Sequence, residues 1–187
     1  MPMKIKTLDF CFENLLVKSV ANRNYPEIQL AGLSAGPFEE GNEYEVHYWI
    51  AQELAESGIV HFREDDCLDA TKLYKIQWKE RVQIAGQISE LTEDFYPKLR
   101  RYLTNLKKDS AKTPEKAQEY EKAKHSAWDI VNSRLKKIVA LSSGPPQTEQ
   151  ILKKFTSEER LIYEQLSDII NKWKAQILDF EGENGAK

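Results

Sequence analysis

The sequence has little of what secretion, membrane insertion or redox chemistry requires. Its 187 residues contain only two cysteines, Cys11 and Cys67, which lack the spacing of a disulfide framework or a CxxC motif. No apolar run approaches the roughly 20 residues that span a bilayer. The N-terminus carries charges where a secretion signal has an apolar core. We therefore expect an intracellular protein with reduced thiols and no membrane contact.

Motifs of catalysis and cofactor binding are also lacking. The three histidines form no HxH or HExxH pattern, and there is no phosphate-binding loop, dinucleotide fingerprint or nucleophile elbow. A metal hydrolase that uses His47, His61 and Asp66 can be drawn as an alternative, and the acidic step 64–66 could hold a divalent cation. Surface histidines and a solvated linker explain these residues with fewer assumptions. We expect no enzyme, no metal and no cofactor.

Charge is distributed unevenly along the chain, although the net charge is only −3. Residues 1–66 contain 5 Lys and Arg against 12 Asp and Glu, whereas residues 67–187 contain 22 against 18. Each part carries both signs, which is not the pattern of a dedicated nucleic-acid or membrane surface. The composition favours protein partners.

The first 64 residues predict a small β-rich domain. The segment Gly32–Gly41 contains three glycines and a proline, which indicates a wide turn. A helix is expected over 48–55, where apolar residues recur at helical spacing until Gly58. Short apolar runs predict strands at 15–20, 28–30, 44–46 and 59–62.

From residue 65 onward, apolar residues recur every three or four positions and predict a helical bundle. Thr113 followed by Pro114 indicates a helix start, and Thr156 with Glu159 forms a capping box. Helices are expected over 68–82, from Thr92 or Asp94 through Leu106, over 113–142, over 149–155 and from 156 onward. The predicted fold class is α+β, with a β-rich domain at 1–64, a helical domain at 65–187 and a disordered-looking tail at 181–187.

Basic residues of the helical part support a DNA-binding protein as the alternative function. Phosphate contacts require only positive charge, without side chains that recognise bases. The same residues also fit the solvated faces of amphipathic helices. They fall into three clusters: Lys98, Arg100, Arg101, Lys107 and Lys108; Arg134, Lys136 and Lys137; and Lys153 with Lys154. Arg100, Arg101, Lys107 and Lys108 are the DNA-contact candidates.

Aromatic residues are abundant for a bundle of this size, with four tryptophans and eight tyrosines in the chain. Trp78, Tyr102, Trp128 and Trp173 fall on helical stripes, which predicts core or interface positions and not a base-stacking platform. Core and interface are equally compatible with the pattern. The candidates for a partner interface are Trp128, Leu135, Tyr163 and Trp173.

The segment Ile28–Leu54 contains the pattern I-x-L-x-G, then G-P-F-x-x-G, then E-V-x-x-W-x-A-x-x-L. With this spacing it resembles the small β-domain of the subunits of GINS, a tetrameric DNA-replication factor of archaea and eukaryotes. His47 and Tyr48 depart from the pattern, which usually has a proline and an apolar residue there. The residues expected to define the turn and the helix are Gly36, Pro37, Phe38, Gly41 and Trp49.

The helical part is similar to the same family. Leu68–Arg81 resembles the first helix of the family's α-domain, Phe95 and Tyr96 open the second, and Trp128 with Asp129, Arg134 and Lys137 resembles the third. The resemblance covers roughly residues 12–180. The order of the domains resembles the class that carries its β-domain first, and the short chain resembles the archaeal form.

This resemblance implies a non-enzymatic scaffold subunit. It implies pairing with an α-first GINS sibling in a two-plus-two heterotetramer that links the MCM replicative helicase to a RecJ/Cdc45-type partner and supports unwinding at the replication fork. Contacts to primase are implied as well, with weak or no direct DNA binding. The implied location is the archaeal cytoplasm at the nucleoid, or the nucleus of a eukaryote.

Overall fold

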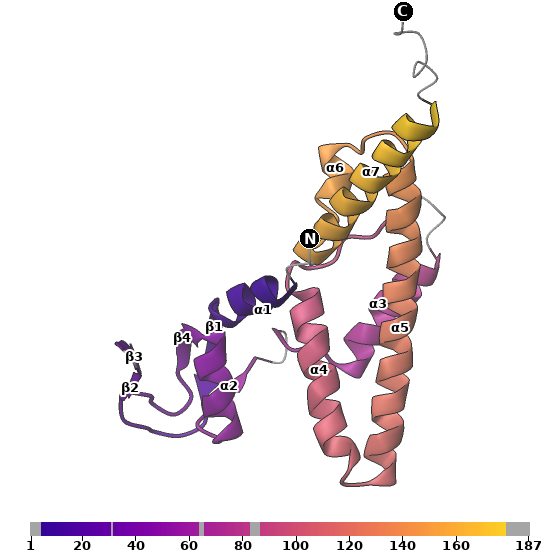
Figure 1. Cartoon of the computed structure of the whole chain (residues 1–187). Coiled ribbons are helices and arrows are strands. Elements are labelled where there is room, and N and C mark those ends of the chain that lie inside the picture. The colour runs from indigo at the N-terminus through magenta and orange to yellow at the C-terminus, as the bar shows by residue number, and fades with distance from the viewer. Residues whose placement is uncertain (1–4, 31, 64–65, 83–86, 179–187) are drawn as a thin grey trace, which may run out of the picture. The chain divides into compact units, whose positions relative to one another are not determined.

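The computed structural model describes residues 5–30, 32–63, 66–82 and 87–178, and the chain forms two compact units (Figure 1). One unit comprises Lys4–Leu68, and the other comprises Asp69–Lys187 together with the first three residues. The first unit contains all the strands described and the second is helical, which confirms the α+β fold class. Residues 64 and 65, at the predicted boundary, and the predicted tail 181–187 lie outside the described residues.

A three-stranded antiparallel sheet of order β4–β1–β5 forms the centre of the first unit. Val17 of β1 lies opposite Val46 of β4, and Val20 lies opposite His61 of β5. β2 and β3 pair separately as an antiparallel hairpin. The elements are α1 (Ile5–Glu13), β1 (Leu16–Ala21), β2 (Ile28–Leu30), β3 (Leu33–Ala35), β4 (Glu43–His47), α2 (Tyr48–Glu56) and β5 (Val60–Phe62).

Two elements of this unit are not predicted from the sequence. α1 has no acidic residue in its first turn and no basic residue in its last turn, so the usual signals of a helix are lacking. β3 lies within the segment 32–41, which was expected to be a turn. Its first two residues are exposed, so it shows no alternation of apolar and polar positions. The other strands and α2 are confirmed.

The glycine-rich turn brings Phe38 into the core of the first unit, where it is 1% exposed. Gly36 has a φ of +96°, and a Cβ on it would lie 2.9 Å from the Phe38 ring, so the turn requires glycine there. Phe38 also forms a β-bridge with Tyr25. Gly41 has a φ of +82°, and Trp49 packs against the same core. The buried core residues are Ala21, Ala35, Phe38, Val46, Ile50, Ala51, Leu54, Ile59 and Val60.

The second unit is built around one long helix, α5, against which α3, α4 and α7 pack (Figure 1). The predicted helix over 68–82 begins later, at Ala70, because the Asp69 carboxylate accepts a hydrogen bond from the backbone N–H of Lys72 at 2.8 Å. α6 is shorter than predicted and ends at Leu152. The helices are α3 (Ala70–Val82), α4 (Phe95–Ser110), α5 (Pro114–Ser143), α6 (Glu149–Leu152) and α7 (Ser157–Leu178).

Both predicted helix starts are confirmed by their hydrogen bonds. Thr113 accepts a hydrogen bond from the N–H of Lys116 at 3.3 Å, with Pro114 in the first turn of α5. At α7, the N–H of Thr156 donates to the Glu159 carboxylate at 3.2 Å, and the N–H of Glu159 donates to the Thr156 hydroxyl at 3.4 Å. None of the described helices combines the length and the apolar character that crossing a bilayer demands.

Candidate protein interface

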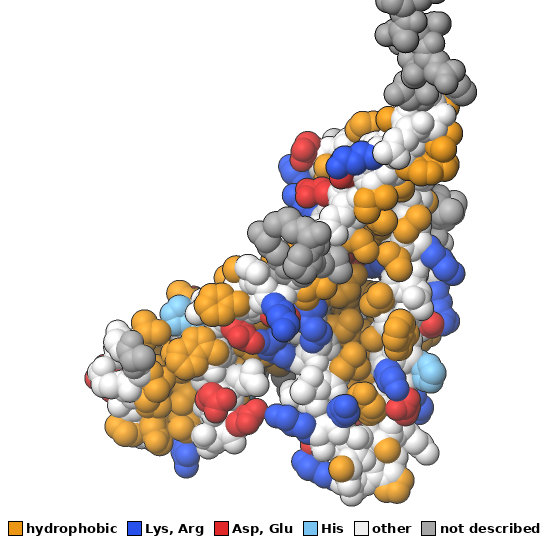
Figure 2. All heavy atoms as spheres, viewed as in Figure 1, with side chains coloured by type: hydrophobic (Ala, Val, Ile, Leu, Met, Phe, Trp, Pro, Cys, Tyr) orange, Lys and Arg blue, Asp and Glu red, His pale blue; other side chains and the backbone are white. Residues whose placement is uncertain are grey.

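The three tryptophans of the helical unit lie at its surface. Trp78, Trp128 and Trp173 are each 59% exposed, so a position in the core is wrong for all three. Tyr102 is half-buried. Figure 2 shows hydrophobic side chains gathered along α7 and over the neighbouring part of α5. Tryptophan is large and apolar, and it is enriched where proteins bind one another. The surface of the helical unit therefore contains the candidate site.

α7 has one apolar face, of which only the first half is covered. Tyr163 is buried against Phe155 in the core, and Ile162 and Leu166 pack against the same cluster. Further along the same face, Ile169, Trp173 and Ile177 are exposed at a spacing of four residues. We call these three residues the α7 stripe.

The α7 stripe is exposed because it lies to one side of the face of α7 that meets α5, and its last residue also lies past the end of α5. The Lys174 ammonium donates a hydrogen bond to the carbonyl of Ser143, the last residue of α5, at 2.8 Å. The last turn of α7 therefore extends past the end of the helix that covers its first half. An apolar helix face without a cover in the described part of the chain is typical of a surface that another subunit covers.

α5 contributes a second set of exposed apolar residues. Trp128, Leu135 and Val139 are all exposed, and their spacing of seven and four residues places them on one side of the helix. Leu135, a predicted interface candidate, is therefore exposed, while Tyr120 and Val131 are half-buried. The residues that α5 buries are Ala123, Ala127, Ile130, Arg134, Lys137, Ile138 and Leu141. Sequence periodicity does not identify this face, because two of its members are cationic.

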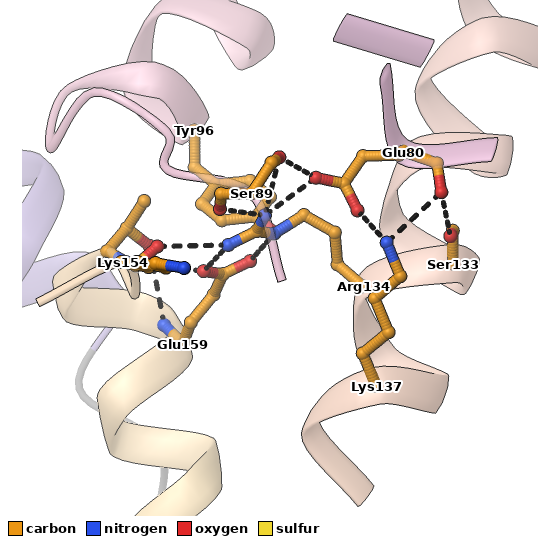
Figure 3. Close-up of polar contacts among 9 residues, drawn as sticks. Glu80, Ser89, Tyr96, Ser133, Arg134, Lys137, Lys154 and Glu159 are labelled. Atoms are coloured by element: carbon orange, nitrogen blue, oxygen red, sulfur yellow. Dashed lines mark hydrogen bonds and ion pairs between the residues drawn. The ribbon is translucent and has the colours of Figure 1, made fainter. Parts of the chain in front are cut away.

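Arg134 is fully buried and joins α5 to α7 (Figure 3). Its guanidinium binds both carboxylate oxygens of Glu159, at 2.5 Å for the contact from Nη2 to Oε2 and by a shorter contact from Nε to Oε1. Nη2 also donates to the Lys154 carbonyl at 3.2 Å. Tyr96 of α4 donates its hydroxyl to the same carboxylate at 2.7 Å. Glu159 is thus both the capping residue of α7 and the ion-pair partner of Arg134.

The other side of the Arg134 guanidinium binds α3. Its Nη1 donates to the Glu80 carboxylate at 2.9 Å and to the Ser89 carbonyl at 2.8 Å. Lys137 donates to the other Glu80 oxygen at 2.6 Å and to the Glu80 carbonyl at 3.1 Å. We call Glu80, Arg134, Lys137 and Glu159 the charge cluster. It contains two cations and two carboxylates, and it ties three helices together.

The electrostatics of the charge cluster favour the ionised forms. Burial raises the pKa of Glu80, but hydrogen bonds from Lys137 and Ser89 and the charge of Arg134 outweigh it, so this pKa lies below its ordinary value. Burial lowers the pKa of Arg134, but hydrogen bonding to Glu159 and the charges of Glu159 and Glu80 outweigh it, so this pKa lies above its ordinary value. Burial and the Glu159 carboxylate raise the pKa of Tyr96. Because each charge has its partners, the cluster holds α7 against α5 and so sets the position of the α7 stripe.

The charge cluster corrects one part of the sequence-based interpretation. Arg134 and Lys137 were grouped with Lys136 as a basic cluster for phosphate contact, but both are buried. Lys136, which lies between them, is exposed. Two features of the sequence pointed to the cluster: the capping-box carboxylate Glu159, and Arg134 between the apolar residues Ile130 and Ile138 at a spacing of four.

The predicted interface residues fall into two groups. Trp128, Leu135 and Trp173 are exposed on α5 and α7. Tyr163 is 9% exposed, and its hydroxyl accepts a hydrogen bond from the N–H of Gln147 at 3.3 Å, so it belongs to the core of the helical unit. The sequence did not single out Ile169 and Ile177, although they share a helix face with Trp173.

The predicted DNA-contact residues all lie on α4. Lys107 and Lys108 are exposed in its last turn, where the helix dipole favours cations. Arg100 lies 3.4 Å from the Glu158 carboxylate, and Arg101 is half-buried. Of these four cations, Lys107 and Lys108 are therefore exposed, while Arg100 and Arg101 are half-buried.

The residues of the alternative metal site do not come together. His47 on β4 and His61 on β5 flank β1 on opposite sides, opposite Leu16 and Val20 respectively. The Nδ1 of His47 lies 2.8 Å from the Asn14 carbonyl, and the Nδ1 of His61 lies 2.5 Å from the Asn22 side-chain oxygen. In the part of the chain that the structure describes, no three His, Cys, Asp or Glu residues could hold a metal ion. Glu64 and Asp65 lie outside the described residues.

Two comparisons with known proteins find similarity to subunits of one DNA-replication complex. The model of the GINS complex subunit Psf2/Psf3-like N-terminal domain matches residues 59–186, which include the whole described helical unit. The human DNA replication complex GINS protein PSF2 is 26% identical over 134 residues, which cover 72% of this chain and 70% of the human protein.

Proposed function

This chain belongs to the family of Psf2/Psf3-like GINS complex subunits, and we propose that it is a non-catalytic scaffold subunit of the class that carries its β-domain first, in its archaeal form. In this proposal, Lys4–Leu68 is the small β-domain and the helical unit is the α-domain of the family. The role in DNA replication agrees with the similarity to human PSF2.

The observation that carries this proposal is the exposed apolar surface of α5 and α7. Trp173 and Trp128 expose large apolar area at the surface of the helical unit, and each fully covered side chain of this size would contribute roughly 2–3 kcal/mol to an association. A helix of a sibling GINS subunit, one that carries its α-domain first, would cover these residues in a two-plus-two heterotetramer.

Partners beyond the sibling subunits follow from the same proposal. The assembled complex would link the MCM replicative helicase to a RecJ/Cdc45-type protein, with a further contact to primase, and would support unwinding at the fork. We propose a location at the archaeal nucleoid, or in the nucleus if the chain is eukaryotic.

Co-expression with a candidate α-first sibling, followed by size-exclusion chromatography with light scattering, tests the proposal. We expect a mass near four subunits with both chains present. Trp173→Glu places a charge in the α7 stripe, and this variant should remain folded but lose the complex. Asn171→Glu is the matched control, because it introduces the same charge at an exposed position on the opposite side of α7. A wild-type chain that stays a monomer with its sibling would contradict the proposal.

One observation favours DNA binding as a second candidate function. α4 carries five cations and Asp109 as its single acidic residue. If α4 binds DNA phosphates, the affinity of the purified chain for duplex DNA should fall steeply with salt, and Lys107→Gln with Lys108→Gln should flatten that slope by about two. An unchanged slope would exclude α4 as the DNA surface.

A further inference from the structure

The outer face of α3 carries a third apolar stripe. Tyr74, Trp78 and Val82 follow one another at a spacing of four residues and are 64%, 59% and 61% exposed. They lie on successive turns of the helix, on the side away from buried Leu73 and Glu80. We call these three residues the α3 stripe. It is separate from the α7 stripe, because it lies on a different helix.

Positive charge flanks the α3 stripe. Lys75, Lys79 and Arg81 are exposed beside it, whereas Glu80, the one acidic residue of α3, points inward to the charge cluster. Asp129 of α5 already binds Arg81 and accepts a hydrogen bond from Gln77 at 2.7 Å. Within the described ranges, Lys75 and Lys79 have no ion-pair partner. This face is therefore apolar along its middle and cationic along its edge.

The α7 stripe differs in its charges. Around Trp173, Lys172 pairs with Asp168 at 2.7 Å, and Lys174 donates to the Ser143 carbonyl. The cations beside that stripe are therefore satisfied within the chain, whereas Lys75 and Lys79 beside the α3 stripe have no ion-pair partner among the described residues. The two surfaces consequently suit partners of different charge.

We propose that the α3 stripe binds an amphipathic α-helix of a partner protein, whose own apolar residues are flanked by Asp and Glu. Spacing by one turn matches the apolar face of a second helix, and carboxylates on its flanks would neutralise Lys75 and Lys79. Trp, Tyr and Arg are the residue types that contribute most at protein interfaces, and the face contains Trp78, Tyr74 and Arg81. Val82 extends the stripe with an aliphatic group, which fits an apolar side chain and offers no ring for a base to stack on.

This inference goes beyond assembly through α7 and does not depend on it. A subunit with a neutral apolar stripe on α7 and a cation-flanked stripe on α3 can hold two partners at once, as a scaffold does. If the tetramer does not form, the proposal for the α3 stripe still stands. If the experiment below fails, the proposal of a tetramer still stands.

The test uses the full chain and two designed, fluorescein-labelled helical peptides of about 18 residues, or five turns. Both peptides carry the same stripe of leucines; one has glutamates beside it and the other has lysines. We expect the glutamate peptide to bind at least about tenfold more tightly by fluorescence anisotropy. Trp78→Ser should weaken its binding by about tenfold. Lys75→Gln with Lys79→Gln should lower both its affinity and its salt dependence.

Phe10→Ser is the matched control, because Phe10 is an aromatic residue about as exposed as Trp78 but lies on α1 and belongs to neither proposed interface. It should leave binding of the glutamate peptide within about twofold. The inference would be overturned by no binding of the glutamate peptide, by equal binding of the two peptides, or by an equal loss with Phe10→Ser. Binding of a labelled oligothymidine that depends on Trp78, in place of the peptide, would assign the face to single-stranded nucleic acid and would also overturn it.

Discussion

The helical unit buries charged side chains in its interior and exposes large apolar side chains at its surface, which is the reverse of the usual arrangement. Among its described residues, the interior contains four charged residues, Glu80, Arg134, Lys137 and Glu159, while the surface carries three tryptophans that are each 59% exposed. Charged residues are rarely buried unless they are paired, and exposed tryptophans are rarely clustered with other apolar residues without a binding role. The difference indicates that the charge cluster orients the helices, and it is the reason why we propose that the exposed apolar residues bind partners.

The largest expected effect comes from breaking the charge cluster. Arg134→Met leaves Glu80 and Glu159 without their shared cation, so we expect a loss of about 3–5 kcal/mol in the free energy of unfolding. Denaturant unfolding followed by circular dichroism measures it. Lys136→Met is the control, because Lys136 is an exposed cation on the same helix and should change stability by less than about 0.5 kcal/mol. Equal effects of the two substitutions would contradict the structural role of Arg134.

A pH series sharpens the role of Glu80. The folded-state pKa of Glu80 lies below its ordinary value of 4.5, so its ionised form stabilises the fold above about pH 4.5 and this contribution is lost as pH falls through the folded-state pKa. We expect Glu80→Gln to be less stable than the wild type near pH 7, and the difference to shrink below pH 4.5. Thermal unfolding of both proteins across this range measures the difference. A difference that stays constant with pH would contradict the predicted ionisation.

The capping box should have a smaller effect. Thr156→Ala removes the hydroxyl that accepts from the Glu159 N–H, while the Glu159 carboxylate keeps its bonds to Arg134. We expect a loss of about 1 kcal/mol in the free energy of unfolding. Thr156→Ser keeps the hydroxyl and should restore most of it. If Thr156→Ala lost as much free energy of unfolding as Arg134→Met, this would contradict the expectation that the cap and the ion pair contribute independently to stability.

The smallest effect on stability is expected at the exposed tryptophans. Trp128→Ser removes a large side chain that the isolated chain does not bury, so the free energy of unfolding should change by no more than about 0.5 kcal/mol. The same substitution should weaken assembly with the sibling subunit if Trp128 is an interface residue. A large loss of stability in the isolated chain would instead place Trp128 in a packed position.

Local features of the fold were predictable because their causes lie within a few residues. The starts of α5 and α7 follow from Thr113 and Thr156, and the turn at Gly36 follows from a positive φ that glycine adopts without strain. α1 and β3 were not predictable, since neither has terminal signals or alternation. Their formation depends on packing within the unit.

The candidate site was predictable only in part. Helical spacing identified Trp128, Leu135 and Trp173, but it also selected Tyr163, which the structure buries. All four are apolar or aromatic residues of α5 or α7. Their exposure depends on which neighbouring helix covers each turn, and periodicity carries no information about that.

By itself, the sequence determined every described helix and strand except α1 and β3, the capping residues, the turn at Gly36–Phe38 and the GINS resemblance, because these depend on local chemistry and spacing. Only the tertiary structure decided that Arg134 and Lys137 are buried, since their partner Glu80 lies more than fifty positions away along the chain. It also decided that Trp173 is exposed, because the neighbouring Lys174, and not Trp173, is on the side of α7 that contacts α5. Burial is a property of which segments meet, and segments that are distant in the chain meet only in the folded molecule.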